Sequence, residues 1–245
     1  MSTTATLATT HRVLRQLRRD RRTLALIFLV PPLLLTLFRY VFDGQPDTFD
    51  RVGGPLVGLF PFISMFLVTS IAMLRERTSG TLERLMSMPV GKLDLLLGYG
   101  LAFSVVAAVQ ATITSAVAFG LLGLDTAGSI GVVVAIAIAN ALLGMALGLF
   151  VSAFASSEFQ AVQFMPAVVI PQLLLSGLIV PRERMAELLE WVSAALPLTY
   201  AYDALAQVTQ DGTLDAGLAA DVGVVTGCIA LALALGAATL PRRTA

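Results

Sequence analysis

The chain has 245 residues, of which 57% are hydrophobic and only 13% are charged, about half the charged share of a typical soluble domain. Its mean hydropathy is +0.85, and a soluble fold of this size cannot bury so much apolar surface. The net charge of zero gives a nucleic-acid partner no electrostatic support, and one cysteine cannot make a disulfide framework. The composition therefore predicts an integral membrane protein.

An arginine-rich stretch covers residues 1–22. Leu7, Leu14 and Leu17 recur there at helical spacing among six arginines, which is typical of an amphipathic helix on an anionic membrane surface. The alternative is a charge cluster that directs membrane insertion and has no fixed structure. No small-residue cleavage site follows the first apolar stretch, so we expect a cytoplasmic N-terminal segment rather than a cleavable signal.

Six long apolar runs follow this segment. About 20 apolar residues, at about 1.5 Å per residue, cross a bilayer core of roughly 30 Å. Continuous runs exclude a closed barrel, which needs alternation, and leave helices as the spanning structure. We therefore predict an all-α integral membrane protein whose membrane domain covers residues 23–241. Its six transmembrane helices are predicted at residues 24–42, 55–74, 95–122, 129–152, 160–180 and 222–240.

Lysine and arginine predict the orientation, because they favour cytoplasmic segments. With the N-terminus inside, twelve lie on the cytoplasmic side: Arg12, Arg15, Arg18, Arg19, Arg21, Arg22, Arg75, Arg77, Arg84, Lys92, Arg242 and Arg243. Only Arg51, Arg182 and Arg184 lie outside, and Arg39 falls within the first predicted span. We expect both termini, the hairpin of residues 75–94 and the tail of residues 242–245 to be cytoplasmic. Residues 181–220 are then external, in what we expect to be a bacterial plasma membrane.

The sequence lacks the residues that most membrane enzymes and ion-coupled carriers need. The only histidine, His11, lies in the N-terminal segment, and no H-E-x-x-H occurs. Gly91-Lys92 is followed by Leu93, so no phosphate-binding G-x-x-x-x-G-K-[ST] motif is present. Arg39 is the only ionisable residue well inside a predicted span, whereas ion-coupled carriers usually keep several. We therefore predict no catalytic residues, no metal site and no ATP hydrolysis by this chain.

Neutral polar and small residues within the spans allow two interpretations each. The polar candidates either line a pathway for an amphipathic substrate or form hydrogen bonds between helices; they are Gln110, Asn140, Gln163 and Gln172. Small residues at four-residue spacing either let helices pack closely within the chain or form a subunit interface. These are Gly144, Gly148 and Ser152, which continue from Asn140, and the pair Gly223 and Gly227.

The cytoplasmic hairpin concentrates seven charges within residues 75–94. Gly80 can start a short helix there, and Glu83 would lie near its positive end. Leu82 and Leu85 share one helical face, while Arg84 offers charge to a partner. This mixture predicts a surface that another protein contacts in water.

Two segments resemble the permease subunits of type-2 ATP-binding-cassette exporters, and daunorubicin-resistance permeases in particular. Residues 76–85, followed by Met88-Pro89-Val90, are similar to the family's E-[KR]-x-x-G-T-[LI]-E-x-L…P run. Residues 176–181 and 196–205 are similar to its S-G-x-x-x-P…P-x-T-Y-x-x-[DE]-x-[LM] stretch. Relatives often carry an arginine after the acidic residue of the second motif, where this chain has Ala206-Gln207.

The resemblance implies roles for both segments. The first would form a coupling helix that docks into the ATPase through Glu76, Arg77, Gly80, Thr81, Leu82, Glu83, Arg84 and Leu85. The second would be part of a re-entrant element that closes the outer end of the pathway, with Pro181, Pro197, Tyr200 and Asp203 as its site residues. Before it, Met185, Leu188, Leu189 and Val192 recur at helical spacing and predict an amphipathic helix, with Trp191 suited to the membrane interface.

The implied function is that of the membrane subunit of an ATP-driven exporter. By resemblance, two permease chains, identical or different, would work with two separate ATPase subunits, which bind ATP and Mg; this chain would hold no cofactor. The expected cargo is an amphipathic drug or antibiotic, and a lipid or polysaccharide is the alternative. A secondary carrier and a membrane-embedded enzyme are the other classes that we considered.

Overall fold

The structure is a computed structural model that describes residues 3–86 and 91–239. The side chains of Glu83, Met86 and Lys92 lie outside that description. Met88-Pro89-Val90 of the first motif and the predicted tail of residues 242–245 also lie outside the described residues.

The described residues form helices joined by short connections. In chain order these are α1 (Thr3–Arg19), α2 (Arg21–Val41), α3 (Pro46–Thr78), α4 (Thr81–Met86), α5 (Lys92–Gly120), α6 (Ile130–Val151), α7 (Glu158–Leu175), α8 (Glu187–Ala194), α9 (Pro197–Ala206) and α10 (Ala216–Ala238). Short 3-10 turns follow α6 and precede α8, and a π turn lies between α9 and α10. Six helices in the described part, namely α2, α3, α5, α6, α7 and α10, are long and apolar enough to cross a membrane. This confirms the predicted six spans.

Two spanning helices begin earlier than predicted. α3 starts at Pro46 rather than at residue 55, and α10 starts at Ala216 rather than at residue 222, within the predicted external segment. Glycine and proline at residues 53–55 lower the local helix propensity. In the structure a Cβ at Gly54 would lie only 2.6 Å from Thr209 Oγ1, so tertiary packing holds this stretch in the helix.

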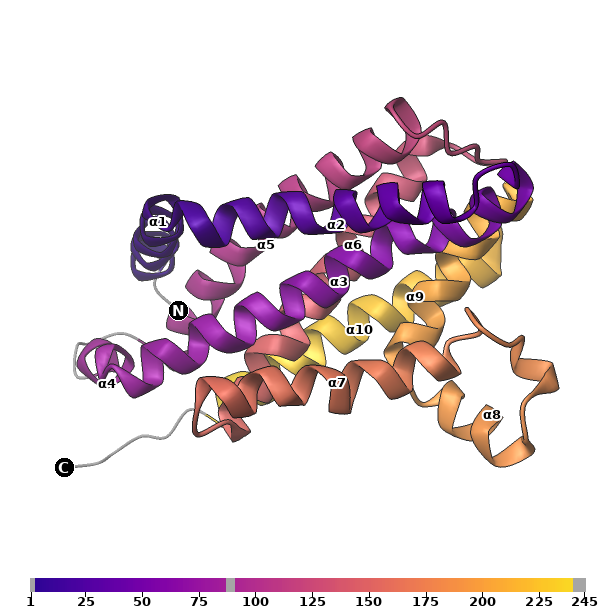
Figure 1. Cartoon of the computed structure of the whole chain (residues 1–245). Helices are drawn as coiled ribbons and strands as arrows, with labels where there is room; N and C mark the ends of the chain where they lie inside the picture. Colours follow the sequence, from indigo (N-terminus) through magenta and orange to yellow (C-terminus); the bar gives the residue numbers. More distant parts are fainter. Residues whose placement is uncertain (1–2, 87–90, 240–245) are drawn as a thin grey trace.

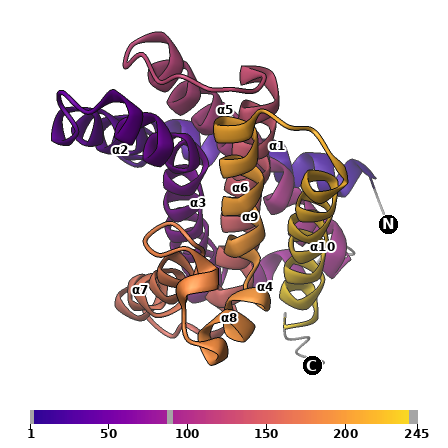
Figure 2. The ribbon, with the colours of Figure 1, turned by 90° about the vertical axis from the view of Figure 1, so that its right-hand side faces the viewer.

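α3 and α6 form the centre of the bundle and approach each other backbone to backbone. A Cβ at Gly144 would lie 2.1 Å from the Phe62 carbonyl oxygen, and a Cβ at Gly148 would lie 2.4 Å from that of Phe66. Glycine permits this approach because it has no side chain. Figure 2 looks along the bundle and shows α3 and α6 in the middle, with α2, α5, α7 and α10 around them. The small residues of α6 therefore pack within the chain.

The glycines of α10 differ from those of α6. A Cβ at Gly223 or Gly227 would meet nothing within 4 Å beyond its own stretch of helix, and both residues are exposed. The packing interpretation is therefore wrong for this pair, and a subunit interface on this face stays a prediction.

The two ends of the bundle carry different elements. α1, α4 and the end of α10 lie at one end, while α8 and the α2–α3 and α5–α6 connections lie at the other (Figure 1). α1 is seen end-on in Figure 1 and lengthwise in Figure 2, so its axis crosses those of the spans. The predicted topology places α1, the hairpin and the end of α10 on the same side of the membrane, and the structure groups them at one end of the bundle. That this side is the cytoplasmic one stays a prediction.

We predict that Gly144→Ala destabilises the protein, because the new methyl group overlaps the α3 backbone; such overpacking costs about 1–3 kcal/mol. Gly223→Ala is the matched control, since alanine favours helix and the site is open. Thermal unfolding of the purified protein in detergent should show a lower midpoint for Gly144→Ala only. Equal midpoints for the two variants would contradict the close α3–α6 contact.

Candidate functional site

The connection from α3 to α4 turns sharply at Ser79 and Gly80. Gly80 has a φ of +71°, a conformation that glycine adopts without strain. Its carbonyl oxygen accepts the hydrogen bond from Arg84 N that starts α4, at 3.1 Å. Ser79 Oγ lies 2.9 Å from Thr81 Oγ1. The predicted short helix after Gly80 is therefore present in the structure.

α4 buries one face and exposes another. Leu82 is only 3% exposed, and the partly buried Leu85 packs against the same core. Arg84 is exposed. The predicted apolar face thus holds α4 against the end of the bundle, while Arg84 faces outward. The predicted role of the Glu83 side chain lies outside the described residues.

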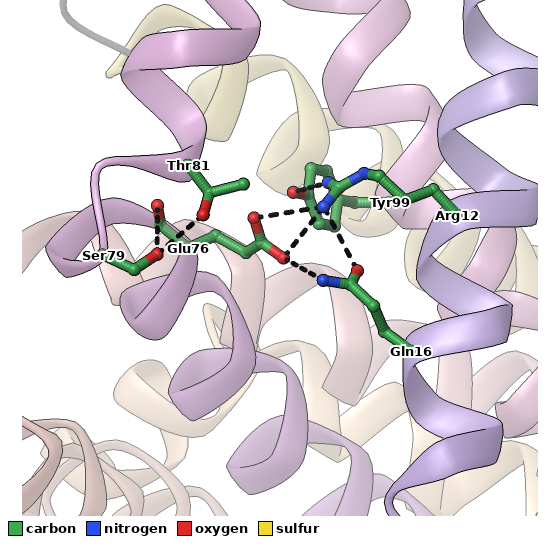
Figure 3. A network of polar contacts seen from close by, with 6 residues as sticks. All are labelled: Arg12, Gln16, Glu76, Ser79, Thr81 and Tyr99. Carbon is green, nitrogen blue, oxygen red and sulfur yellow. Dashed lines mark hydrogen bonds and ion pairs between the residues drawn. The ribbon is translucent and has the colours of Figure 1, made fainter.

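Glu76 points into a polar network beside this hairpin (Figure 3). Arg12 Nη1, from α1, donates a hydrogen bond to Glu76 Oε1 at 3.3 Å and forms an ion pair with it. Gln16 Nε2, also from α1, donates to the same oxygen at 3.4 Å. Arg12 Nη2 donates to the Tyr99 hydroxyl of α5, and the guanidinium carbon lies 5.4 Å from the Tyr99 ring centre. The middle of α1, the end of α3 and the first turns of α5 are therefore joined at one point.

This network is shielded from solvent. The side chains of Glu76 and Arg12 are 13% and 29% exposed, and Tyr99 is 1% exposed. Because salt and water screen shielded charges less than exposed ones, this ion pair is less sensitive to salt than a surface pair.

α1 is also held against α5 by a close backbone contact. Thr10 Oγ1 donates to the Gly98 carbonyl oxygen at 3.1 Å, and a Cβ at Gly98 would lie 2.5 Å from Thr9 Cβ. The N-terminal segment is thus an ordered helix packed on the bundle, and the interpretation without fixed structure is wrong for residues 3–19.

Sequence reasoning placed Glu76 and Arg77 on an outward docking surface. The structure places Glu76 in the network instead, and Arg77 is half-buried. The four-residue spacing of Arg12 and Gln16 signals that they share a helical face. No local pattern, however, connects that face to Glu76 or Tyr99, which are distant in the sequence.

α9 is a short helix packed among longer ones toward the opposite end of the bundle (Figures 1 and 2). Pro197 is its first residue. Its buried residues Leu198, Ala201, Ala204 and Leu205 are all 0% exposed. Asn140 Nδ2 of α6 donates to the Ala201 carbonyl oxygen at 3.3 Å. The predicted element too short to span is therefore a buried helix, and its re-entrant role stays a prediction.

Hydroxyl groups connect α7, α8 and α9. Ser193 Oγ donates to the Leu175 carbonyl oxygen at 2.7 Å, and Thr199 Oγ1 donates to the Ser193 carbonyl oxygen at 2.8 Å. The Tyr200 hydroxyl donates to the Ala194 carbonyl oxygen at 2.6 Å. Pro181, by contrast, is exposed in the loop before these helices.

α8 is the amphipathic helix predicted between the last two spans. Leu188, Leu189, Trp191 and Val192 are all exposed, and Ser193 is the only buried residue of the helix. An apolar face that the chain leaves uncovered is typical of a helix at the membrane interface.

Asp203 has a cationic partner outside its own motif, which is followed by Ala206-Gln207. Arg182 Nη2 lies 2.9 Å from Asp203 Oδ2, so the partner comes from the loop before α8. Burial raises the pKa of Asp203 to about 6, against the opposing attraction of Arg182. Sequence reasoning counted Arg182 only as an external charge, because the pairing depends on how the loop folds over α9.

The predicted polar residues of the spans take different positions. Gln110 Nε2 donates to the Ile27 carbonyl oxygen and to Ser64 Oγ, both at 2.8 Å, and so connects α5 with α2 and α3. Asn140 connects α6 with α9, as described above. Gln172 is buried and donates to its own helix. Gln163 is exposed on α7. The hydrogen-bonding interpretation thus fits Gln110 and Asn140.

A cavity of about 800 Å³ lies beside the network of Arg12, Glu76 and Tyr99. Its walls are mainly apolar side chains of α2 and α3, including Leu26, Leu34 and Ile63. Ser64 adds a hydroxyl group, and Glu76 lines it together with Gln16 and Tyr99 of the network. Pockets that hold drug-sized molecules have this size and this mostly apolar lining with a few polar groups.

Comparison with known proteins places this arrangement in a family. Residues 4–209 match the family model described as ABC-2 type transporter. The chain is 29% identical over 161 residues to the probable multidrug ABC transporter permease YbhR of Escherichia coli (strain K12), covering 65% of this chain and 44% of that protein. It is 28% identical over 171 residues to ABC transporter G family member 20 of Dictyostelium discoideum, covering 69% of this chain and 23% of that protein.

A third relative covers more of the chain. The probable multidrug ABC transporter permease YbhS of Escherichia coli (strain K12) is 25% identical over 192 residues, which are 78% of this chain and 51% of that protein. The chain thus spans about half or less of the length of these relatives. The family model covers most of the chain, including α1, α4 and α9. The chain therefore belongs to the ABC-2 type transporter family, as a membrane permease.

Proposed function

We propose that this permease is the membrane subunit of an ATP-driven exporter that moves an amphipathic drug or antibiotic out of a bacterial cell. The cavity beside the hairpin carries this proposal. Its apolar walls suit the body of an amphipathic molecule, and Ser64, Gln16 and Glu76 offer hydrogen bonds to its polar part. The cavity is also lined by Glu76 and Tyr99 of the network, so cargo would contact the side chains that connect the end of α3 with α1 and α5.

ATPase subunits of the ABC type are the partners that the family implies. In the proposed complex they bind ATP and Mg and contact the exposed Arg84 of α4, with Gly80 and Thr81 setting the turn into this helix. Arg77 and Glu83 belong to the same proposed docking segment. Two permease chains would face each other in the plasma membrane, each with its own ATPase subunit.

Glu76 acts in this proposal as a positioning residue rather than as a docking residue. Movement of α4 on ATP binding reaches α1 through the Arg12–Glu76 pair and reaches α5 through Tyr99. At the outer end, α9 with Pro197, Tyr200 and Asp203 would close the pathway, because Arg182 ties α9 to the preceding loop.

A lipid is the second candidate cargo. The cavity walls contributed by α2 include Leu26, Val30 and Leu34, which are exposed large hydrophobic residues, and an acyl chain fits such a lining. A polysaccharide, whose surface is rich in hydroxyl groups, is less suited to it.

Transport by the reconstituted complex tests the proposal. Proteoliposomes that contain the permease and its ATPase should accumulate amphipathic fluorescent dyes when ATP is added. Ile63→Trp fills the cavity and should abolish accumulation, while Leu101→Trp, at an exposed position on α5 outside the cavity, should preserve it. If no dye moves but a fluorescent phospholipid does, the lipid candidate replaces the drug. Equal transport by both tryptophan variants would remove the cavity from the pathway.

We predict that Glu76→Gln uncouples cargo binding from ATP hydrolysis without releasing the ATPase. Glutamine keeps an oxygen that accepts from Arg12 but loses the charge, which weakens the contact by about 1 kcal/mol, so dye-stimulated ATPase activity should fall about fivefold. The exchanged pair Arg12→Glu with Glu76→Arg should recover part of it, because the opposite charges again meet. Co-purification of the ATPase checks assembly. No recovery in the exchanged pair, with the ATPase still bound, would contradict a coupling role for the ion pair.

We predict that export falls as the external pH falls through about 6. The raised pKa of Asp203 means that its carboxylate is ionised above about pH 6 and neutral below it, so acid weakens the Arg182–Asp203 pair. The Asp203→Asn variant should export slowly at both pH 5 and pH 8. Because the ATPase responds to pH equally in both proteins, the ratio of wild-type to variant export reports only the titration of Asp203. A ratio that does not change between pH 5 and pH 8 would contradict a gating role for the pair.

A further inference from the structure

α1 has two faces of different chemistry. Thr9 and Val13 are buried on the face that packs against α5 and the end of α3. The other face carries exposed basic residues, which continue into the start of α2: Arg15, Arg18, Arg19, Arg21 and Arg22. Within the described residues, none of these five arginines forms an ion pair.

α1 lies across one end of the bundle, where its basic face can meet the lipid headgroups of the predicted membrane. Its axis crosses the spanning helices at the same end of the bundle as α4 (Figures 1 and 2). Leu7 is 63% exposed and lies three helical turns before Arg18, on the same face. Exposed leucine among arginines is typical of a helix at an interface that contains anionic lipids.

Asp20 is the only acidic residue among residues 1–22, so it offsets only one of these five positive charges. Its carboxylate accepts hydrogen bonds from Thr23 N at 3.1 Å and from Thr23 Oγ1 at 2.6 Å, and so caps α2. The five arginines are therefore available to phosphate groups outside the protein.

α1 also carries the network described above, which connects this helix to the residues beside the hairpin. Arg12 contacts Glu76, which lies three residues before Ser79 and the turn into α4. Arg12 also contacts Tyr99 in the first turns of α5. α1 thus contacts both helices that flank the hairpin.

We propose that anionic phospholipids of the leaflet beside α4 bind the basic face of α1, and that the Arg12–Glu76–Tyr99 network carries this binding to the hairpin. Lipid charge then sets the rate at which the associated ATPase turns over. The proposal rests on the proposed contact between α4 and the ATPase, but it requires no particular cargo.

ATP hydrolysis in lipid nanodiscs of defined composition tests this proposal. The complex of permease and ATPase, without cargo, should hydrolyse ATP about fivefold faster when phosphatidylglycerol replaces part of the phosphatidylcholine; this is the low end of usual allosteric effects. The triple variant Arg15→Gln, Arg18→Gln, Arg19→Gln should lose this stimulation. The control, Arg51→Gln with Arg184→Gln, changes exposed arginines at the other end of the bundle and should keep it.

A second measurement separates lipid binding from its transmission. An environment-sensitive bimane on Leu7→Cys, in a Cys228→Ser background, should shift its emission to the blue when phosphatidylglycerol is present. The same label combined with Glu76→Gln should keep the blue shift, while the ATPase loses its response to phosphatidylglycerol. The triple arginine variant should lose both, although it still co-purifies with the ATPase.

Two results would overturn the proposal. One is an ATPase rate that does not change when phosphatidylglycerol is added, and the other is a control variant that loses as much stimulation as the triple arginine variant. The outcome is independent of the export assay. If lipid-dependent ATP hydrolysis is found but no dye is transported, the exporter proposal fails and the lipid effect stands.

Discussion

The close contact between α3 and α6 is the constraint on which the rest of the structure depends. Between helices in hydrocarbon there is no hydrophobic driving force, so close packing must hold them together. Gly144 and Gly148 provide it by letting the α6 backbone touch the α3 carbonyl groups. α3 is thereby fixed in the middle of the bundle over its 33 residues, a length of about 50 Å at 1.5 Å per residue.

Because α3 is held in this way, one helix contacts the π turn after α9, the cavity and the network beside the hairpin. Near its start, Gly54 packs on Thr209 in the π turn after α9. Along its side it forms a wall of the cavity. At its end, Glu76 joins α1 and α5 beside the hairpin. In the proposed scheme, a displacement of α4 therefore acts on one continuous helix that reaches both the cavity and the π turn after α9.

Local sequence patterns predicted three features of the fold: the spans, the turn at Gly80 and the amphipathic helix α8. Each depends on apolar, charged or glycine residues that are close together in the sequence. The contacts between side chains at the candidate site could not be predicted from the sequence. Arg12 and Tyr99 are far apart in the sequence, and the partner of Asp203 is Arg182 rather than a residue of its own motif. The start of α3 was missed for the same reason: Gly54 lowers helix propensity locally, yet Thr209 packs where its side chain would be.

The most direct test of this coupling scheme is the distance between α1 and the hairpin during ATP binding. Spin labels on Leu7→Cys and Ser79→Cys, in a Cys228→Ser background, report it by pulsed electron paramagnetic resonance on the complex with its ATPase. If the network joins α1 to the end of α3, the two labels move together. The distribution of distances between them then has the same position and width with and without ATP. It should broaden or shift when Glu76→Gln is added. A shift in the wild-type network on ATP binding would show that α1 and the hairpin move separately and would contradict the scheme.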